Sequence, residues 1–289
     1  MTAKIIDGNE IARMVRADWK VRANKLKAAG IMPGLAVIIL GTDPASQLYV
    51  RNKIKACESI GIFSSPHALA VDTPQDEVLA LIDRQNSDPR IHGILVQLPL
   101  PPQIDVSTVI ERIAPEKDVD GFGLYNVGGL VTGGTVFPPC TPYGVVSMLE
   151  YSNIPISAQN VVVVGASNIV GKPMALMLMQ KEATVAICHI KTRDLAQFTI
   201  LADILVVAAG KPNLITAPMV RTGAVVIDVG INRLADGRFV GDVDFEAVKE
   251  KASYITPVPG GVGPMTVTML LCNTIRSAER HAKKRGIET

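Results

Sequence analysis

Residues 161–173 read VVVVGASNIVGKP. The four valines predict a buried strand, Gly165 a tight turn and Gly171 the start of a helix. A turn of this kind directs backbone N–H groups and the positive end of a helix toward a phosphate group. The pattern is typical of dinucleotide-binding turns, although Ser167 stands where their second glycine would be. The alternative is a purely structural strand-to-helix turn.

Apolar strands continue to alternate with helix-period segments after this turn. The expected strands are Val161–Val164, Thr184–Ile187, Ile204–Val207, Val225–Asp228 and Tyr254–Ile255. A β-α-β order predicts a mainly parallel sheet that is covered by helices on both faces. We therefore expect residues 141–264 to form a Rossmann-like dinucleotide-binding domain.

The end of the second expected strand indicates which dinucleotide binds. Residues 188–193 read CHIKTR, and the first carboxylate after them is Asp194. Enzymes that use NAD usually place an acidic residue about 20 residues after the turn, where it binds the ribose hydroxyls. Lys191 and Arg193 would instead attract a 2′-phosphate, which favours NADP. The alternative is that both cations are solvated surface charges.

The first half of the chain shows the same alternation and predicts a second α/β domain over residues 1–140. Its expected elements are a helix over 10–29, a strand over 35–40, a helix over 44–60, a strand over 65–71, a helix capped by Thr73 with Pro74 in its first turn, and a strand over 91–96. Residues 114–141 are rich in Gly and Pro and read as a loop at the domain junction. The fold class is therefore α/β, with two α/β domains and a cleft between them. The last helix, within residues 265–289, is expected to pack back on the first domain.

Tyr49 and Lys53 are the first candidate catalytic pair. They lie four residues apart in an expected helix and therefore share one face of it. A lysine that is partly removed from water can act as an acid or a base near neutral pH. The alternative is that Lys53 is a surface charge and Tyr49 a half-buried packing residue.

Two further segments carry polar side chains in positions suited to a ligand. Gln97 follows the expected strand 91–96 and precedes Leu98 and Pro99, so its amide lies where open α/β sheets bind ligands and is presented by a stiff backbone. Asp118 and Asp120 flank a valine. This acidic segment is either an ordinary solvated turn or a site for a ligand amine.

Composition limits the remaining functions. Apolar residues make up 48% of the 289 residues and charged residues 19%, and the net charge of +2 gives no electrostatic footprint for nucleic acid or an anionic membrane. The four cysteines are widely spaced and the four histidines are scattered, so neither a metal site nor a disulfide framework is expected. No apolar stretch reaches the about 18 residues of a membrane span, and the N-terminal residues do not resemble a signal peptide. We expect a cytoplasmic protein.

Six motifs, in order along most of the chain, resemble those of the bifunctional methylenetetrahydrofolate dehydrogenase/cyclohydrolase family. They are Tyr49 with Lys53, the run 96–101 (VQLPLP), residues 117–122 (KDVDGF), residues 139–142 (PCTP), the turn 165–171 and residues 257–264 (PVPGGVGP). The resemblance implies a folate-binding first domain, an NADP-binding second domain and a homodimer. It also implies tetrahydrofolate one-carbon derivatives as substrates.

The resemblance assigns roles to individual residues of this chain. Lys53 is the catalytic lysine, aided by Gln97, while Tyr49 lies against the folate and Asp120 holds its pterin ring. The implied substrate site adds Leu98, Pro99, Pro259, Gly260, Gly261 and Val262, and the implied cofactor site comprises Gly165, Ala166, Ser167, Ile169, Val170, Ile190, Lys191, Arg193 and Ile231. Many members have arginine at position 166 and serine at position 190, so the cofactor preference of this chain rests on Lys191 and Arg193.

The implied chemistry is oxidation of 5,10-methylenetetrahydrofolate to the 5,10-methenyl cation, followed by hydrolysis to 10-formyltetrahydrofolate. Two alternatives remain open. One is a dehydrogenase of a small hydroxy or amino acid, which leaves the proline-bounded Gln97 and the Asp120 loop unexplained. The other is a folate- or nucleotide-binding module without catalysis, against which the intact Lys53 argues.

Overall fold

The computed structural model describes residues 2–287, which form two compact units. The first, the six-stranded unit, contains residues 2–13 and 141–266; the second, the three-stranded unit, contains residues 14–140 and 267–287. Residues 2–13, which the sequence assigns to the first domain, are grouped with the six-stranded unit. The reason is that β1 (Lys4–Ile5) pairs in parallel with β11 (Tyr254–Ile255).

The sheet of the six-stranded unit is parallel throughout, with the strand order β1-β11-β8-β7-β5-β6. The chain runs from β5 to β6 on one side and then returns to β7 on the other side of β5. This reversal creates a topological switch point at the carboxyl end of β5, where open α/β sheets bind their ligands. The strands are β5 (Asn160–Val164), β6 (Thr184–Cys188), β7 (Ile204–Val207) and β8 (Val225–Asp228), which confirms the strands expected there.

Buried aliphatic side chains hold this sheet together. Val162, Val164, Leu205, Val207 and Val226 belong to one core cluster and alternate along their strands with residues that face the other side. The remaining elements of the unit are α6 (Cys140–Tyr151), α7 (Gly171–Gln180), α8 (Leu195–Thr199), the 3₁₀ helix η1 (Ala217–Met219), an antiparallel hairpin of β9 (Asn232–Arg233) and β10 (Phe239–Val240), and α9 (Phe245–Lys249).

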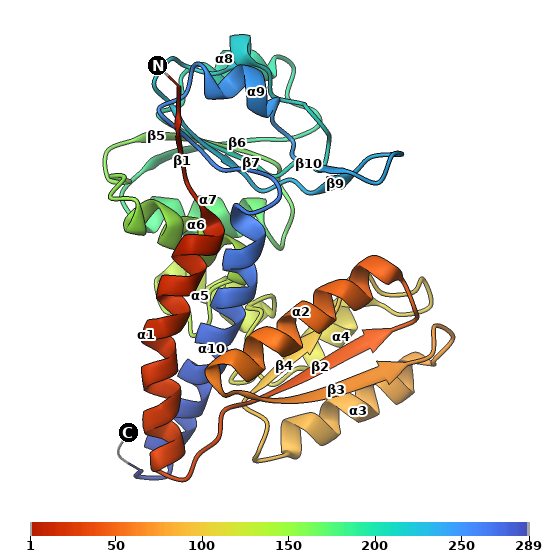
Figure 1. The fold of residues 1–289 in the computed structure, drawn as a ribbon. Helices are drawn as coiled ribbons and strands as arrows, with labels where there is room; N and C mark the ends of the chain where they lie inside the picture. The colour runs from red at the N-terminus through yellow and green to blue at the C-terminus, as the bar shows by residue number, and fades with distance from the viewer. Residues whose placement is uncertain (1, 288–289) are drawn as a thin grey trace. The chain divides into compact units, whose positions relative to one another are not determined.

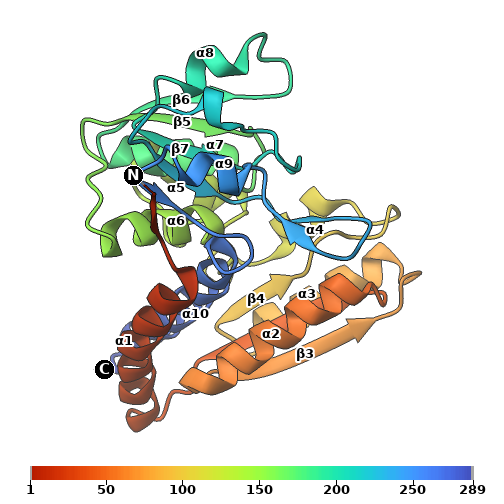
Figure 2. The ribbon, with the colours of Figure 1, turned by 45° about the horizontal axis from the view of Figure 1, so that its top comes forward.

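The three-stranded unit contains a short parallel sheet of order β3-β2-β4 (Figure 1 and Figure 2). Its strands are β2 (Gly34–Leu40), β3 (Phe63–Leu69) and β4 (Gly93–Val96), and its helices include α2 (Pro44–Ile60), α3 (Gln75–Ser87) and α4 (Val106–Arg112). Ala36, Ile38 and Leu40 share a core cluster with side chains of α3 and α4. Helix α2 lies on the other face of the sheet (Figure 1). Because the three strands run in parallel, their carboxyl ends meet at one edge of the sheet.

Several details differ from the expectations. Strand β3 begins at Phe63, two residues early, and the helix-capping role expected of Thr73 is wrong because Pro74 occupies the cap position of α3 without a side-chain hydrogen bond. The expected loop 114–141 contains helix α5 (Leu124–Thr132), whose two internal glycines weaken the helical signal. The helices α1 (Gly8–Ala28) and α10 (Val262–Lys284) complete the chain. No helix within residues 2–287 is long and apolar enough to cross a bilayer.

Candidate active site

The three-stranded unit buries a lysine against a glutamine. Lys53 lies in the middle of α2, and only 7% of its surface is exposed. Its Nζ donates a hydrogen bond of 3.0 Å to Oε1 of Gln97, which follows the carboxyl end of β4. The structure thus brings together two of the predicted catalytic residues, at the edge of the sheet where a ligand was expected.

The Gln97 amide is fixed at both of its polar atoms. Its Oε1 accepts from Lys53, while its Nε2 donates to the backbone oxygen of Leu98 at 2.6 Å. The backbone N–H of Gln97 donates to the Ile38 oxygen, which anchors it to β2. The Leu98–Pro99 peptide bond is cis. The amide therefore has one orientation, with its oxygen toward the lysine.

Tyr49 stands one helical turn before Lys53 on α2. Its side chain is 37% exposed, and burial of the rest raises the pKa of its hydroxyl. A partly exposed aromatic ring of this kind can offer an apolar face to a flat ligand.

Asp120 supplies a carboxylate near Lys53. Burial raises the pKa of its carboxyl, and the positive charge of Lys53 and a hydrogen bond with the Cys140 thiol act in the opposite direction. Burial, followed by the charge of Asp120, also raises the pKa of Cys140 well above its ordinary value, so this thiol is a neutral neighbour rather than a nucleophile. Lys53, Gln97 and Asp120 form the group called here the lysine site.

Asp118 has a different task from Asp120, although the sequence presents the two alike. Asp118 is 2% exposed, and its carboxylate accepts the backbone N–H groups of the residues Gly121, Phe122 and Gly123 at 3.1, 3.3 and 2.8 Å. It also accepts from Asn126 Nδ2 at 2.8 Å. Asp118 therefore shapes the loop, which leaves Asp120 as the carboxylate available to a ligand.

Asn273 of α10 fixes both ends of this loop, a role that sequence reasoning missed. Its Nδ2 donates to the backbone oxygens of Val119 at 2.9 Å and Pro138 at 3.0 Å. The side chain is completely buried. The partners lie 154 and 135 positions away in the sequence, so no local pattern signals the contact.

In the six-stranded unit, the turn after β5 depends on two glycines. A side chain at Gly165 would place Cβ 2.1 Å from the Ala208 oxygen, and Gly165 has a φ of 124°. A side chain at Gly171 would meet the Gly165 oxygen at 2.0 Å. Only glycine allows these close approaches, so the turn can bring its backbone close to a phosphate at the amino end of the ten-residue helix α7.

Ser167 helps to build this turn. Its Oγ accepts the backbone N–H groups of Val170 at 3.1 Å and Gly171 at 3.3 Å. The hydroxyl hydrogen stays available to donate to a ligand oxygen. Ser167 and Ile169 are exposed, while Ala166 and Val170 are partly buried, so the predicted turn residues form one accessible surface.

The residues after β6 favour a phosphate over a ribose hydroxyl. Ile190 is 97% exposed, and Lys191 and Arg193 are exposed as well. The Asp194 carboxylate accepts the N–H groups of Ala196 and Gln197 as the cap of α8. Because Asp194 already has this role, the segment offers cations and no unpaired carboxylate.

Two buried carboxylates shape the loops after β7 and β8. Asp242 accepts the backbone N–H groups of residues 209, 210 and 211 at 2.6, 2.8 and 2.9 Å. Asp228 accepts those of residues 230, 242 and 243 at 2.9, 3.0 and 2.9 Å, and burial raises its pKa to about 6. Ile231, which is 45% exposed, lies between these anchored segments. Asp228 is the last residue of β8 and Asp242 lies two residues after β10, so a carboxylate at the carboxyl end of a strand is the signal that could have pointed to this pair.

The turn 259–262 belongs to the six-stranded unit. Gly260 has a φ of 103°, and a Cβ at Gly261 would meet the Pro257 oxygen at 2.5 Å. Gly8 at the start of α1 approaches so closely that its Cβ would lie 1.7 Å from the Gly261 oxygen. The Val258–Pro259 bond is cis. Gly260 is therefore required by its backbone conformation, and Gly261 and Gly8 by the close approach of neighbouring backbone atoms.

Among residues 2–287 no group of three or more His, Cys, Asp or Glu side chains is arranged to hold a metal ion. The three-stranded unit supplies a lysine, an amide and a carboxylate, and the six-stranded unit supplies a turn suited to a phosphate. Together with the parallel sheet and its switch point, these features define an α/β enzyme of the dinucleotide-binding class.

Comparison with known families is in agreement. Residues 6–120 match the catalytic domain of the tetrahydrofolate dehydrogenase/cyclohydrolase family, and residues 139–282 match its NAD(P)-binding domain. The chain belongs to the tetrahydrofolate dehydrogenase/cyclohydrolase family.

Relatives match the chain over nearly its full length. The bifunctional protein FolD of Nitrosospira multiformis is 63% identical over 287 residues, which is 99% of this chain and 100% of the relative. A solved structure of the bifunctional enzyme FolD from Campylobacter jejuni is 51% identical, covers 96% of this chain and 99% of its own, and gives a TM-score of 0.95. The enzyme of Trypanosoma brucei, solved with NADP and an inhibitor, is 39% identical over 97% of this chain and 98% of its own, with a TM-score of 0.94.

Proposed function

We propose that this protein oxidises 5,10-methylenetetrahydrofolate to 5,10-methenyltetrahydrofolate with NADP and then hydrolyses the product to 10-formyltetrahydrofolate. Family membership supports both activities. Among the residues of this chain, the main support is the hydrogen bond between Lys53 and Gln97, with Asp120 close by.

Asp120 and Tyr49 bind the folate in this proposal. The pterin ring presents an amino group and a ring N–H, which are donors that a carboxylate accepts as a pair. Tyr49 is half exposed and packs against the flat face of the ligand. The loop that carries Asp120 keeps its shape because Asp118 and Asn273 hold its backbone.

Lys53 moves protons during hydrolysis. Addition of water to the methenyl carbon releases a proton, and opening of the five-membered ring requires one at the departing nitrogen. Lys53 Nζ takes the first proton and delivers the second. Gln97 holds Nζ in one place through its fixed oxygen, so no reorientation precedes either transfer.

The residues of the six-stranded unit fit NADP. The Gly165 turn and the amino end of α7 hold the pyrophosphate, and Ser167 donates its hydroxyl to it. Lys191 and Arg193 bind the 2′-phosphate, and Ile231 presents an exposed apolar side chain to the nicotinamide half. When bound, NADP accepts the hydride that the methylene carbon of the substrate gives up.

A homodimer in the cytoplasm completes the proposal. Strand β6 is at the edge of its sheet, and large apolar side chains near it are exposed, including Ile187, Phe198 and Leu201. An unpaired edge with apolar neighbours favours association with a second copy. Sedimentation of Leu201→Lys beside the unaltered chain tests this: a monomeric variant supports the interface, and an unchanged dimer rejects it.

Four free, buried thiols favour a reducing compartment.

The enzymatic proposal is tested with purified protein, methylenetetrahydrofolate and either NADP or NAD. NADPH and 10-formyltetrahydrofolate should both accumulate. Formation of NADPH alone would remove the hydrolase activity, and formation of neither product would reject the proposal.

A further inference from the structure

The three-stranded unit has a pocket at the amino ends of its strands. It has a volume of about 460 Å³ and lies beside Phe63, where β3 begins, and His92, which precedes β4. Gln97 of the lysine site follows the opposite, carboxyl end of β4. The four residues of β4 separate the two places, so this pocket is not part of the catalytic group.

The polar end of the pocket is built from two histidines with unused nitrogens. His92 is 4% exposed, and its Nδ1 accepts the backbone N–H of Gly34 at 3.1 Å. The neutral ring therefore carries its proton on Nε2, which has no hydrogen-bond partner among the described residues. His281 meets it edge to face with the ring centres 5.3 Å apart, and its Nε2 also has no partner there. Buried polar atoms in folded proteins normally have partners, so this end is built for an additional group.

The charge around this end is positive. The residue after α10, Arg285, is exposed and forms no ion pair within residues 2–287. Burial, His281 and Lys117 lower the pKa of His92 to about 4, against the smaller opposite effects of the Arg90 backbone and the Asp88 charge. Burial with the charges of Arg285, Lys117 and Lys284 lowers the pKa of His281. Asp88 lines no part of the pocket and is already paired with Arg90 at 2.7 Å. A cation would be repelled here and an anion attracted.

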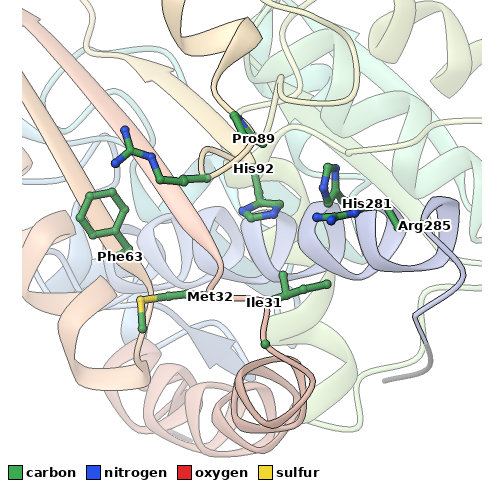
Figure 3. A pocket seen from close by; sticks show the side chains of 9 residues that line it. Ile31, Met32, Phe63, Pro89, His92, His281 and Arg285 are labelled. Carbon is green, nitrogen blue, oxygen red and sulfur yellow. The ribbon is translucent and has the colours of Figure 1, made fainter.

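Phe63 and Met32 form an apolar part of the pocket. Figure 3 shows the rings of His92 and His281 lying together with the Arg285 side chain beside them, while Phe63 and Met32 lie on the far side. Phe63 and Met32 are 42% and 53% exposed. Arg90 also lines the pocket, but its guanidinium is paired with Asp88, so among the described residues the unpaired guanidinium and the free ring nitrogens are at the histidine end.

We propose that this pocket binds a small organic oxyanion, a phosphate monoester or a carboxylate joined to an apolar or aromatic body. The oxyanion is held by the Arg285 guanidinium and by the Nε2–H of His92, and the apolar body lies on Phe63 and Met32. In this proposal the exposed Arg285 side chain rotates toward the ligand. This movement gives the ligand access to the buried imidazole nitrogens. The pocket lies at the opposite end of β4 from the lysine site and contains none of its residues, so its test does not depend on the proposed activity.

The test uses phenyl phosphate and benzoate as probes of the two possible anions, with benzyl alcohol as the neutral aromatic. Calorimetry measures affinity, and the ring nitrogens of His92 and His281 are followed by NMR. We expect at least one anion to bind and shift both rings, and benzyl alcohol to bind far more weakly. Absence of binding by both anions, or equal affinity for benzyl alcohol, would overturn the proposal, as would Zn²⁺ binding to the two rings.

Variants locate the site. Arg285→Gln should weaken anion binding about tenfold, since a charge-assisted hydrogen bond is lost. Lys283→Gln removes an equal charge from an exposed position two residues earlier and should change the affinity little. His92→Asn keeps an acceptor for the Gly34 N–H and removes Nε2, so binding should fall while thermal stability is kept. Equal losses in Arg285→Gln and Lys283→Gln would show non-specific attraction and overturn the proposal.

Discussion

Lys53 Nζ donates a hydrogen bond of 3.0 Å to Gln97 Oε1, and the Gln97 amide is itself locked by a bond to the next carbonyl. The buried Lys53 side chain thus has one acceptor whose position is fixed. In the proposed mechanism this explains why a glutamine, followed by a proline-stiffened backbone, stands at the carboxyl end of β4.

The role of Gln97 is testable by Gln97→Met, which keeps the length of the side chain and removes the acceptor. Lys53 then loses its fixed position, and we expect kcat for methenyltetrahydrofolate hydrolysis to fall by about tenfold or more. Affinity for NADP serves as the control, because the cofactor turn belongs to the other unit. An unchanged kcat in a folded variant would show that the amide does not position the lysine.

Asp120 and Asp118 should respond differently to the same substitution. Asp120→Asn removes a carboxylate that accepts hydrogen bonds from the pterin, each worth roughly 1.5–3 kcal/mol, so folate affinity should fall about ten- to a hundredfold. Stability should be kept or improved, because burial already disfavours the charged form of Asp120. Folate binding and thermal melting are measured side by side.

Asp118→Asn should instead lower the melting temperature, because one side-chain amide cannot accept the three backbone N–H groups that the carboxylate holds. Each buried donor left without a partner costs about 1–3 kcal/mol. Similar effects of the two variants on stability and on affinity would mean that the assignment of separate roles is wrong.

The cofactor preference should depend on the cations after β6. In Lys191→Ser and Arg193→Ser, we expect kcat/KM for NADP to fall about tenfold each while kcat/KM for NAD changes little, since only the 2′-phosphate is lost as a partner. Lys20→Ser, at an exposed position on α1, controls for the general loss of positive charge. A clear preference of the unaltered chain for NAD would mean that Ala166 and Ile190 decide the matter.

Asp228 should make stability depend on pH between about 4 and 6. Burial raises its pKa from 3.8 to about 6, so between these values the folded chain keeps a proton that the unfolded chain releases. Its contribution to stability is therefore present at low pH and is lost as the pH rises through about 6. The loss amounts to at most roughly 3 kcal/mol, because one pKa unit corresponds to about 1.4 kcal/mol.

Melting curves of wild type and Asp228→Asn at several pH values check this. The variant has no titrating group at that position, so its stability relative to wild type should improve as the pH rises from about 4 to about 6. A difference between the two proteins that does not vary with pH would show that Asp228 has an ordinary pKa.

The parallel sheets were predictable because their strands are continuous apolar runs bounded by glycine, such as residues 161–164 and 35–40. The strand β1 and the hairpin β9–β10 were not, because these two-residue strands lie outside the alternation of strands and helices that indicated the equally short β11. Helix α5 was hidden by its glycines, which have low helix propensity. Local pattern therefore predicts long buried elements and misses those that tertiary pairing creates.

The candidate site shows the same division. Lys53, Gln97 and Asp120 were selected from the sequence by spacing and family resemblance, and the structure brings them together. The separate task of Asp118 depends on which backbone N–H groups its loop turns inward, and that of Asn273 on a contact across 154 positions. Neither is encoded in a local motif. The charge of a lysine or arginine, by contrast, is visible in the sequence, as at Lys191 and Arg193.

The central claim is that Lys53 carries the protons of the hydrolysis. The most direct test is the rate of methenyltetrahydrofolate hydrolysis by Lys53→Met, measured beside Lys55→Met, which removes an exposed lysine from the same helix. We predict that Lys53→Met folds, binds NADP normally and has lost the hydrolase activity, while Lys55→Met hydrolyses at the wild-type rate. Hydrolysis at the wild-type rate by Lys53→Met would contradict the account.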